Sequence, residues 1–189
     1  MRVAISGSHG TGKSTLIAAF LERRPEYVYE PEAYEALADD IALTSEEGPT
    51  PEGLEALLQY TVAAVAGHSP GTRVVFERSP VDYLAYAAAS RRTWPPRGTA
   101  TFLRTNVPVV RASLRGLDLI ALVPVSRRGP IAARPGEDER FRKRVDERLR
   151  RALLDDDHDL FAGAATRVVE LPPFPERQLQ ELLRLTPPQ

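Results

Sequence analysis

A run of eight residues near the N-terminus has the spacing of a phosphate-binding loop. Its sequence, Gly7-Ser8-His9-Gly10-Thr11-Gly12-Lys13-Ser14, fits the pattern G-x-x-x-x-G-K-[ST]. Glycines let the backbone curl so that N–H groups point at phosphate oxygens, and the N-terminus of a following helix adds partial positive charge. We therefore expect the loop, extended to Thr15, to bind ATP. Lys13 would reach the β- and γ-phosphates, and the Ser14 hydroxyl would ligate Mg²⁺.

The motif indicates nucleotide binding but not a reaction, because GTPases, motor-like ATPases and small-molecule kinases share it. No Asn-Lys-x-Asp segment lies near the fourth expected strand, which disfavours a Ras-like GTPase. ATP and GTP both remain open as donors. His9 occupies a variable position of the motif and is more typical of an ordinary loop residue than of a catalytic one.

Charged residues directly follow the second and third expected strands. Glu30 ends the second strand, with Glu32 two residues later, and Glu77 and Arg78 follow the third. In an open parallel sheet ligands bind beyond the carboxyl ends of the strands, so these residues should converge with Lys13. A carboxylate there could accept the proton of an attacking hydroxyl or hold hydrated Mg²⁺, and an arginine could clamp the phosphate. Glu30, Glu32 and Glu77 are alternatives for the base, and ordinary surface charge is the other interpretation.

This chemistry needs a scaffold of alternating strands and helices. Apolar runs predict strands at residues 2–6, 27–30, 73–76, 118–125 and 167–171. Helical patterns are expected from Lys13 to before Pro25 and at residues 33–43, 54–68, 80–90, 99–114, 137–154 and 175–185, with an interruption near Pro108. Apolar strands that alternate with helices indicate an α/β fold, a parallel sheet covered on both faces.

Composition bounds the class of protein. The chain has 189 residues, which favours one domain over residues 1–189. Its 25 Lys+Arg against 26 Asp+Glu give a net charge of -1, which argues against binding of a nucleic-acid polymer. The absence of cysteine excludes disulfides and thiolate metal sites. With no apolar run long enough for a membrane span and no signal peptide, we expect a cytoplasmic protein with no membrane partner.

Three further segments resemble the deoxynucleoside kinases within the P-loop nucleoside and nucleotide kinases. The segments are Tyr29-Glu30-Pro31, Leu58-Gln59-Tyr60 and Val75-Phe76-Glu77-Arg78-Ser79. The resemblance implies that Glu30 is the base toward the sugar hydroxyl, that Gln59 pairs with the nucleoside base, and that Glu77 and Arg78 serve Mg²⁺ and the reacting phosphate. It also implies a five-stranded sheet of order 2-3-1-4-5. From the residues alone, Gln59 could equally be a surface side chain of its helix.

The segment at residues 80–86 is also similar to a wider group of small P-loop ATPases, which includes thymidylate kinase and nicotinamide riboside kinase. The arginine-rich region at about residues 126–150 resembles the mobile lid of such kinases, whose arginines fold over the phosphates. Arg134, in the loop, and Arg140, in the first helical turn, are the candidate lid arginines. The other interpretation is a solvated helix whose arginines pair with neighbouring carboxylates.

These patterns favour an ATP- and Mg²⁺-dependent phosphotransferase that acts on a hydroxyl of a small acceptor, a nucleoside or nucleoside-like molecule. The alternative is a nucleotide-hydrolysing regulatory ATPase that acts on a protein partner. The apolar helix at residues 54–68 could supply a homodimer interface, and packing in the core would account for it equally well. The sequence does not identify the acceptor.

Overall fold

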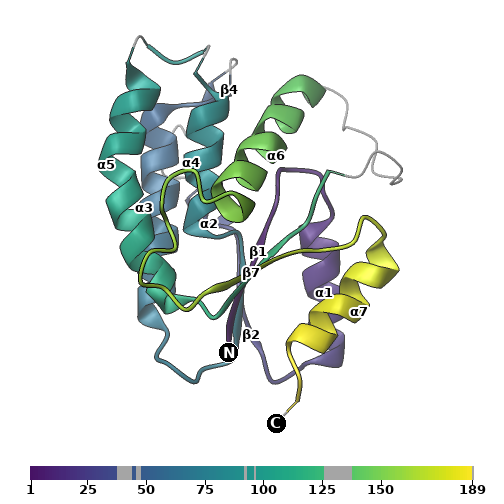
Figure 1. Cartoon of the computed structure of the whole chain (residues 1–189). Coiled ribbons are helices and arrows are strands. Elements are labelled where there is room, and N and C mark those ends of the chain that lie inside the picture. The colour runs from purple at the N-terminus through teal and green to yellow at the C-terminus, as the bar shows by residue number, and fades with distance from the viewer. Residues whose placement is uncertain (38–43, 46–47, 92, 96, 126–137, 189) are drawn as a thin grey trace.

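The computed structural model describes residues 1–37, 44–45, 48–91, 93–95, 97–125 and 138–188. A five-stranded parallel sheet forms its centre, with the strand order β2-β5-β1-β6-β7 (Figure 1). The strands are β1 (Arg2–Ser6), β2 (Val28–Glu30), β5 (Val74–Glu77), β6 (Leu119–Leu122) and β7 (Arg167–Glu170). Numbered along the chain within this sheet, the order is 2-3-1-4-5, and the expected fold class is confirmed.

Helices cover both faces of the sheet, as Figure 1 shows. One face packs against α3 (Pro51–Gly67), α4 (Pro80–Ala89), α5 (Gly98–Ser113) and α6 (Glu139–Leu154) through the larger apolar core. The other face packs against α1 (Lys13–Arg23) and α7 (Pro175–Leu185) through a smaller core. Side chains alternate along a strand, so Ala4 of β1 faces the larger core and its neighbours Val3 and Ile5 face the smaller one.

The register of the sheet fixes which strand ends meet. Val75 of β5 pairs with Val3 of β1 on one side and with Tyr29 of β2 on the other. Because all five strands are parallel, the segments that leave β1, β2 and β5 emerge at the same edge. The phosphate loop, Glu32 and Arg78 are therefore brought to one end of the molecule.

The helices follow the sequence pattern with some differences at their ends. α3 begins at Pro51, three residues earlier than expected, because the Thr50 hydroxyl accepts a hydrogen bond from the Gly53 N–H (3.0 Å) and caps it. α6 begins at Glu139 rather than at 137, which lies outside the described residues. α2 (Ala33–Leu37) covers the first half of the predicted helix at 33–43, and the second half also lies outside them.

Two expectations about the scaffold are wrong. α5 continues through Pro108 without interruption, because the buried side chains of Phe102, Asn106 and Val110 recur every four residues and hold this face against its neighbours. The two prolines and two glycines of residues 46–53 predict a loop, but this segment contains the short strand β4 (Gly48–Pro49), which pairs with β3 (Thr44–Ser45). In the part of the chain that the structure describes, no helix is both long and apolar enough to cross a bilayer.

Candidate functional site

The phosphate loop connects the buried end of β1 to the first turn of α1. Gly10 and Gly12 have φ angles of 66° and 89°, a region that side chains with a Cβ rarely occupy. A Cβ on Gly7 would lie 2.7 Å from the Val123 carbonyl oxygen, which leaves no room for a side chain. The glycines of the motif are therefore required by the backbone path of the loop.

Lys13 lies under this loop with its side chain buried. Its ammonium group donates a hydrogen bond to the Ser8 carbonyl oxygen (3.0 Å), which also accepts one from the Thr11 hydroxyl (2.9 Å). Burial, and next to it the positive charge of Arg78, lower the pKa of Lys13 to about 8 against the opposing effect of nearby carboxylates. Among the residues that the structure describes, no carboxylate forms an ion pair with Lys13, so a bound phosphate would supply the missing counter-charge.

Binding of a nucleotide should therefore be coupled to proton uptake by Lys13. Phosphate charge favours the ammonium form, so binding raises the pKa of Lys13 above its value of about 8 in the free protein. We expect uptake of roughly three quarters of a proton per ADP at pH 8.5, falling to about a tenth at pH 7. Calorimetry in two buffers of different ionisation enthalpy measures this uptake. The Lys13→Arg variant, which stays charged, should show none; equal uptake in both proteins would contradict the assignment.

Ser14 and Glu77 form an oxygen-donor pair on the α1 side of the sheet. The Ser14 hydroxyl donates to the Glu77 carboxylate (2.7 Å), and the Tyr29 hydroxyl donates to the second oxygen of the same carboxylate (2.7 Å). A hydroxyl and a carboxylate are ligands that suit Mg²⁺, which takes only one or two protein ligands when phosphates and water supply the others. No group of three or more His, Asp or Glu side chains that could hold a metal ion occurs among the described residues. Ser14 and Glu77 would hold the ion.

Arg78, the residue after Glu77, points toward the opposite side of the sheet. Its backbone has a φ of 84°, unusual for a residue with a side chain. Its guanidinium donates to the Gly7 carbonyl (2.9 Å), to the Asp82 carboxylate (3.3 Å) and to the Glu32 carboxylate. Burial by itself lowers the pKa of Arg78, but Tyr86 and the two carboxylates raise it well above its usual value. Arg78 is thus a buried, permanently charged group that touches the start of the phosphate loop.

Asp82 joins α4 to the loop and to Arg78. Its carboxylate is fully buried and accepts hydrogen bonds from the Gly7 N–H (3.1 Å), the Ser79 N–H (3.0 Å) and the Ser79 hydroxyl (3.0 Å), besides that from Arg78. Asp82 stands three residues after the N-cap Ser79, the spacing of a capping box. That spacing is a sequence signal for a helix start, but it does not reveal the contacts with Gly7 and Arg78.

Replacement of Asp82 should destabilise the fold. In Asp82→Asn a buried ion pair is broken and an amide N–H₂ faces other donors, so we expect a loss of about 3 kcal/mol of unfolding free energy. Glu32 still compensates part of the charge of Arg78, which keeps the loss at the lower end for such pairs. Urea denaturation measures the change. The same substitution at exposed Asp155 should cost under about 0.5 kcal/mol; equal losses at both positions would contradict the expectation.

A cavity of about 440 Å³ opens beside the phosphate loop on the α3–α6 side of the sheet. Glu32 and Arg78 carry the formal charges among its described lining residues, and the other walls are aliphatic or aromatic. Burial raises the pKa of Glu32, but the charges of Arg78 and Lys13 outweigh burial and lower it overall, so the carboxylate is ionised near neutral pH. The cavity is lined by His9, Glu32, Tyr34, Pro49, Leu54, Leu57, Arg78, Tyr83, Tyr86 and Phe141.

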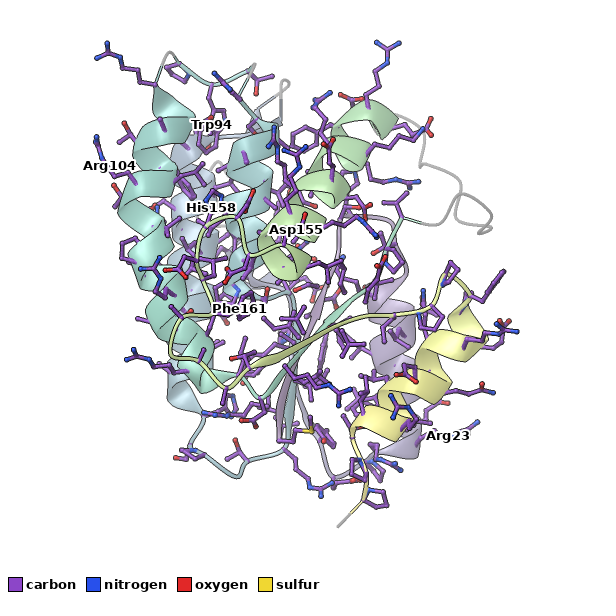
Figure 2. All side chains as sticks on the ribbon, in the orientation of Figure 1. Arg23, Trp94, Arg104, Asp155, His158 and Phe161 are labelled. Atoms are coloured by element: carbon purple, nitrogen blue, oxygen red, sulfur yellow. The ribbon has the colours of Figure 1, made fainter. Side chains whose placement is uncertain are left out.

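Aromatic side chains connect the wall of this cavity to the loop. Phe141 of α6 stacks on the His9 ring with 6.5 Å between centroids, and it lies edge-on to Tyr86 at 6.0 Å. The His9 N–H donates to the Tyr86 hydroxyl (3.0 Å). Trp94, labelled in Figure 2, donates its indole N–H to the carbonyl of Pro49 (2.8 Å), another lining residue. His9 and Phe141 thus bring the loop and α6 to the same cavity.

The structure brings together four of the predicted site residues, Lys13, Ser14, Glu77 and Arg78, at one sheet edge. It does not bring Glu30 into this group. The Glu30 carboxylate lies 2.7 Å from His68 Nε2, the residue that follows α3, and Glu32 lines the cavity instead.

Gln59 also lies away from the cavity. It is exposed on α3 and donates to Glu55 (2.9 Å), while Leu54 and Leu57 of the same helix face the cavity. This is the surface position that the sequence left open. No periodicity of the helix could show which of its faces meets the site.

The two lid candidates differ in what the structure says of them. Arg140 is exposed in the first turn of α6, and its backbone N–H donates to the capping carboxylate of Asp138 (2.8 Å). Arg134 lies outside the described residues. Elsewhere on α6 some charges pair with carboxylates on the same helix, as the solvated-helix interpretation expects; the pairs include Lys143–Glu139 and Arg151–Glu147.

The chain is similar to known proteins in its sequence and in its fold. Residues 2–168 match a family of AAA domains. A search of curated proteins finds no match. Among solved structures, the chain is similar to deoxyadenosine kinase from M. mycoides with the products dCMP and a flexible dCDP bound (TM-score 0.62, 15% identity, 98% of this chain and 96% of that chain covered). It is also similar to the same kinase with bound dATP (TM-score 0.64, 16% identity, 98% and 97% covered).

The likeness to the kinase structures shows a shared fold, because the identity is low. The match to the family model shows membership of a family, because it covers residues 2–168. This range includes the phosphate loop and the segment that carries Glu77 and Arg78. The chain therefore belongs to the AAA-domain family of P-loop proteins.

Proposed function

We propose that the protein is an ATP- and Mg²⁺-dependent phosphotransferase that acts on a hydroxyl group of a small acceptor, a nucleoside or a nucleoside-like molecule. The observation that carries the proposal is the cavity of about 440 Å³ that adjoins the phosphate loop and holds an ionised carboxylate, Glu32. A protein that only hydrolyses nucleotide needs no cavity for an acceptor beside its phosphate loop. The volume falls within the range of small-molecule sites.

The walls of the cavity fit an acceptor with a flat ring. Tyr34, Tyr83, Tyr86 and Phe141 offer aromatic surface for stacking, and Leu54 adds aliphatic surface. The likeness to deoxyadenosine kinase, determined with dATP and with dCMP, supports a nucleoside-like ligand. The acceptor would enter the cavity with its hydroxyl toward Glu32.

Each charged group then has a role in transfer of the phosphoryl group. Lys13 would stabilise the negative charge on the transferring phosphate, and Glu32 would accept the proton of the acceptor hydroxyl. Arg78 would hold Glu32 in place and add positive charge beside the loop. Ser14 and Glu77 would hold Mg²⁺, which when bound supplies charge neutralisation at the phosphate oxygens. Closure of the segment at about 126–150 over the phosphates, with Arg134 and Arg140 as lid arginines, is part of the proposal.

The test is ATP consumption with Mg²⁺, with and without a panel of ribonucleosides, deoxynucleosides and nicotinamide riboside, with products identified by mass. A phosphorylated acceptor that appears in step with ADP would establish the kinase and name its acceptor. Steady hydrolysis that is indifferent to every acceptor would contradict the proposal and favour a regulatory ATPase with a protein partner.

A further inference from the structure

A second cavity lies on the outer side of the helices, apart from the site above. Its volume is about 620 Å³, and none of its lining residues lines the first cavity. It lies where the end of α4, the beginning of α5 and the middle of α6 come together; Figure 1 shows α5 and α6 on either side of α4. Three arginines line it, Arg91 after α4, Arg97 before α5 and Arg148 on α6, and the other lining residues are small or apolar except for Thr99.

No described residue supplies a counterion to any of the three arginines. Within the described part of the chain none of them forms an ion pair or a side-chain hydrogen bond, and no carboxylate lines the cavity. Three like charges around one concavity repel one another and create a positive potential that favours a bound anion. Several other basic residues of α6 do form ion pairs; these pairs include Lys143–Glu139, Arg144–Asp138, Arg150–Glu170 and Arg151–Glu147.

The beginning of α5 adds to this positive potential. Arg97 is its N-cap, with a φ of 68° and no side chain that caps the helix, and no acidic residue occurs in the first turn. Thr99 and Ala100 of that turn line the cavity. Free N–H groups at a helix start carry partial positive charge and accept oxyanions, so the helix end supports the arginines.

We propose that this cavity is a second anion site, which binds the phosphoryl groups of a small polyphosphate-bearing molecule. A guanidinium group binds phosphate oxygens through two parallel hydrogen bonds. One guanidinium is enough to pair with a carboxylate, so three around one cavity favour a ligand with several phosphoryl groups. A small molecule fits better than a nucleic acid, because the charge is confined to one concavity and the whole chain has a net charge of -1. The proposal does not depend on the reaction proposed for the first cavity.

The position of the site gives it a structural consequence. Arg148 lies two turns, or about 10 Å, along α6 from Phe141, which lines the first cavity. A polyphosphate held by Arg91, Arg97 and Arg148 would link α6 to the ends of α4 and α5. Since a ligand that binds only the folded protein stabilises it, binding should raise the melting temperature in proportion to the logarithm of ligand concentration.

The test separates this site from the phosphate loop. In Lys13→Ala protein, which has a weakened loop, we expect tripolyphosphate to bind with a stoichiometry of one in calorimetry. On that background, Arg91→Gln, Arg97→Gln and Arg148→Gln together should weaken binding at least tenfold and abolish the rise in melting temperature. Arg104→Gln is the matched control: Arg104 is exposed on α5, does not line the cavity, and is labelled in Figure 2.

Three results would overturn the proposal. The first is equal binding of tripolyphosphate by the triple variant and by the Arg104→Gln control. The second is equal affinity for citrate, which would show a site for any polyanion. The third is tighter binding of a single-stranded oligonucleotide that the triple variant loses, which would assign the surface to a polymer. Arg91→Lys, a conservative change at an exposed position, should retain part of the affinity for tripolyphosphate. Retained affinity would show that a substitution at this position leaves the fold intact.

Discussion

Lys13→Ala should lose phosphoryl transfer by at least ~10³-fold in kcat, because removal of one positive group from a transferring phosphate costs this much in comparable sites. The fold should not suffer. Lys13 is buried, and its lowered pKa means that keeping its ammonium group charged destabilises the folded protein. The Ser8 carbonyl that Lys13 contacts also accepts a hydrogen bond from Thr11, so it stays satisfied in the variant.

The chain offers a matched control for this change. Lys143 is the second of its two lysines; it is exposed on α6 and pairs with Glu139 (2.7 Å). Lys143→Ala should keep full activity. The measurement is the rate of product formation with the acceptor found in the panel, together with the melting temperature of each variant. Full activity in Lys13→Ala would refute the mechanism.

Glu32→Gln should lower kcat by about 10²–10⁴-fold while nucleotide affinity changes little, since loss of a general base affects the chemical step. Glu32 lines the cavity and its carboxylate is held by Arg78, and a glutamine keeps the size and a hydrogen bond but cannot take a proton. The lowered pKa of Glu32 adds a pH expectation. The carboxylate stays ionised down to its depressed pKa, so protonation of Glu32 should reduce activity only below pH ~4.5, its ordinary value.

The same substitution two residues earlier is the control. Glu30 contacts His68 and does not line the cavity, so Glu30→Gln should keep near-normal kcat. Rates at saturating acceptor and ATP, with ADP affinity measured separately, distinguish the two variants. The opposite result, with Glu30→Gln inactive and Glu32→Gln active, would return the role of base to Glu30.

Local sequence was enough to predict the scaffold. The glycine spacing of the loop, the apolar run before it and the helical pattern after Lys13 are contiguous in the chain, and each has a direct backbone cause. Parallel strands that end at one edge then account for the convergence of Lys13, Ser14, Glu77 and Arg78. The strand order came from the resemblance to deoxynucleoside kinases and is confirmed.

Side-chain direction at the ends of β2 and α3 could not be predicted in this way. Tyr29 and Glu30 are neighbours, so they point to opposite faces: Tyr29 reaches Glu77 on the α1 side, and Glu30 reaches His68 on the α3 side. The pairing of Tyr29 with Val75 decides which of the two side chains faces the α1 side. A shift of one residue in this register would exchange their faces. The orientation of α3 likewise turns Gln59 to solvent and Leu54 to the cavity.

The sequence by itself therefore determined that this protein holds a phosphate loop at the edge of a parallel sheet, because those features depend on backbone conformations that a few contiguous residues impose. Only the tertiary structure decided which carboxylate faces the cavity. Glu32 reaches the cavity because the chain turns after β2, and Arg78, which follows β5, supplies the opposite charge. Contacts of this kind join residues far apart in the chain, and they depend on register and helix rotation, which no local pattern encodes.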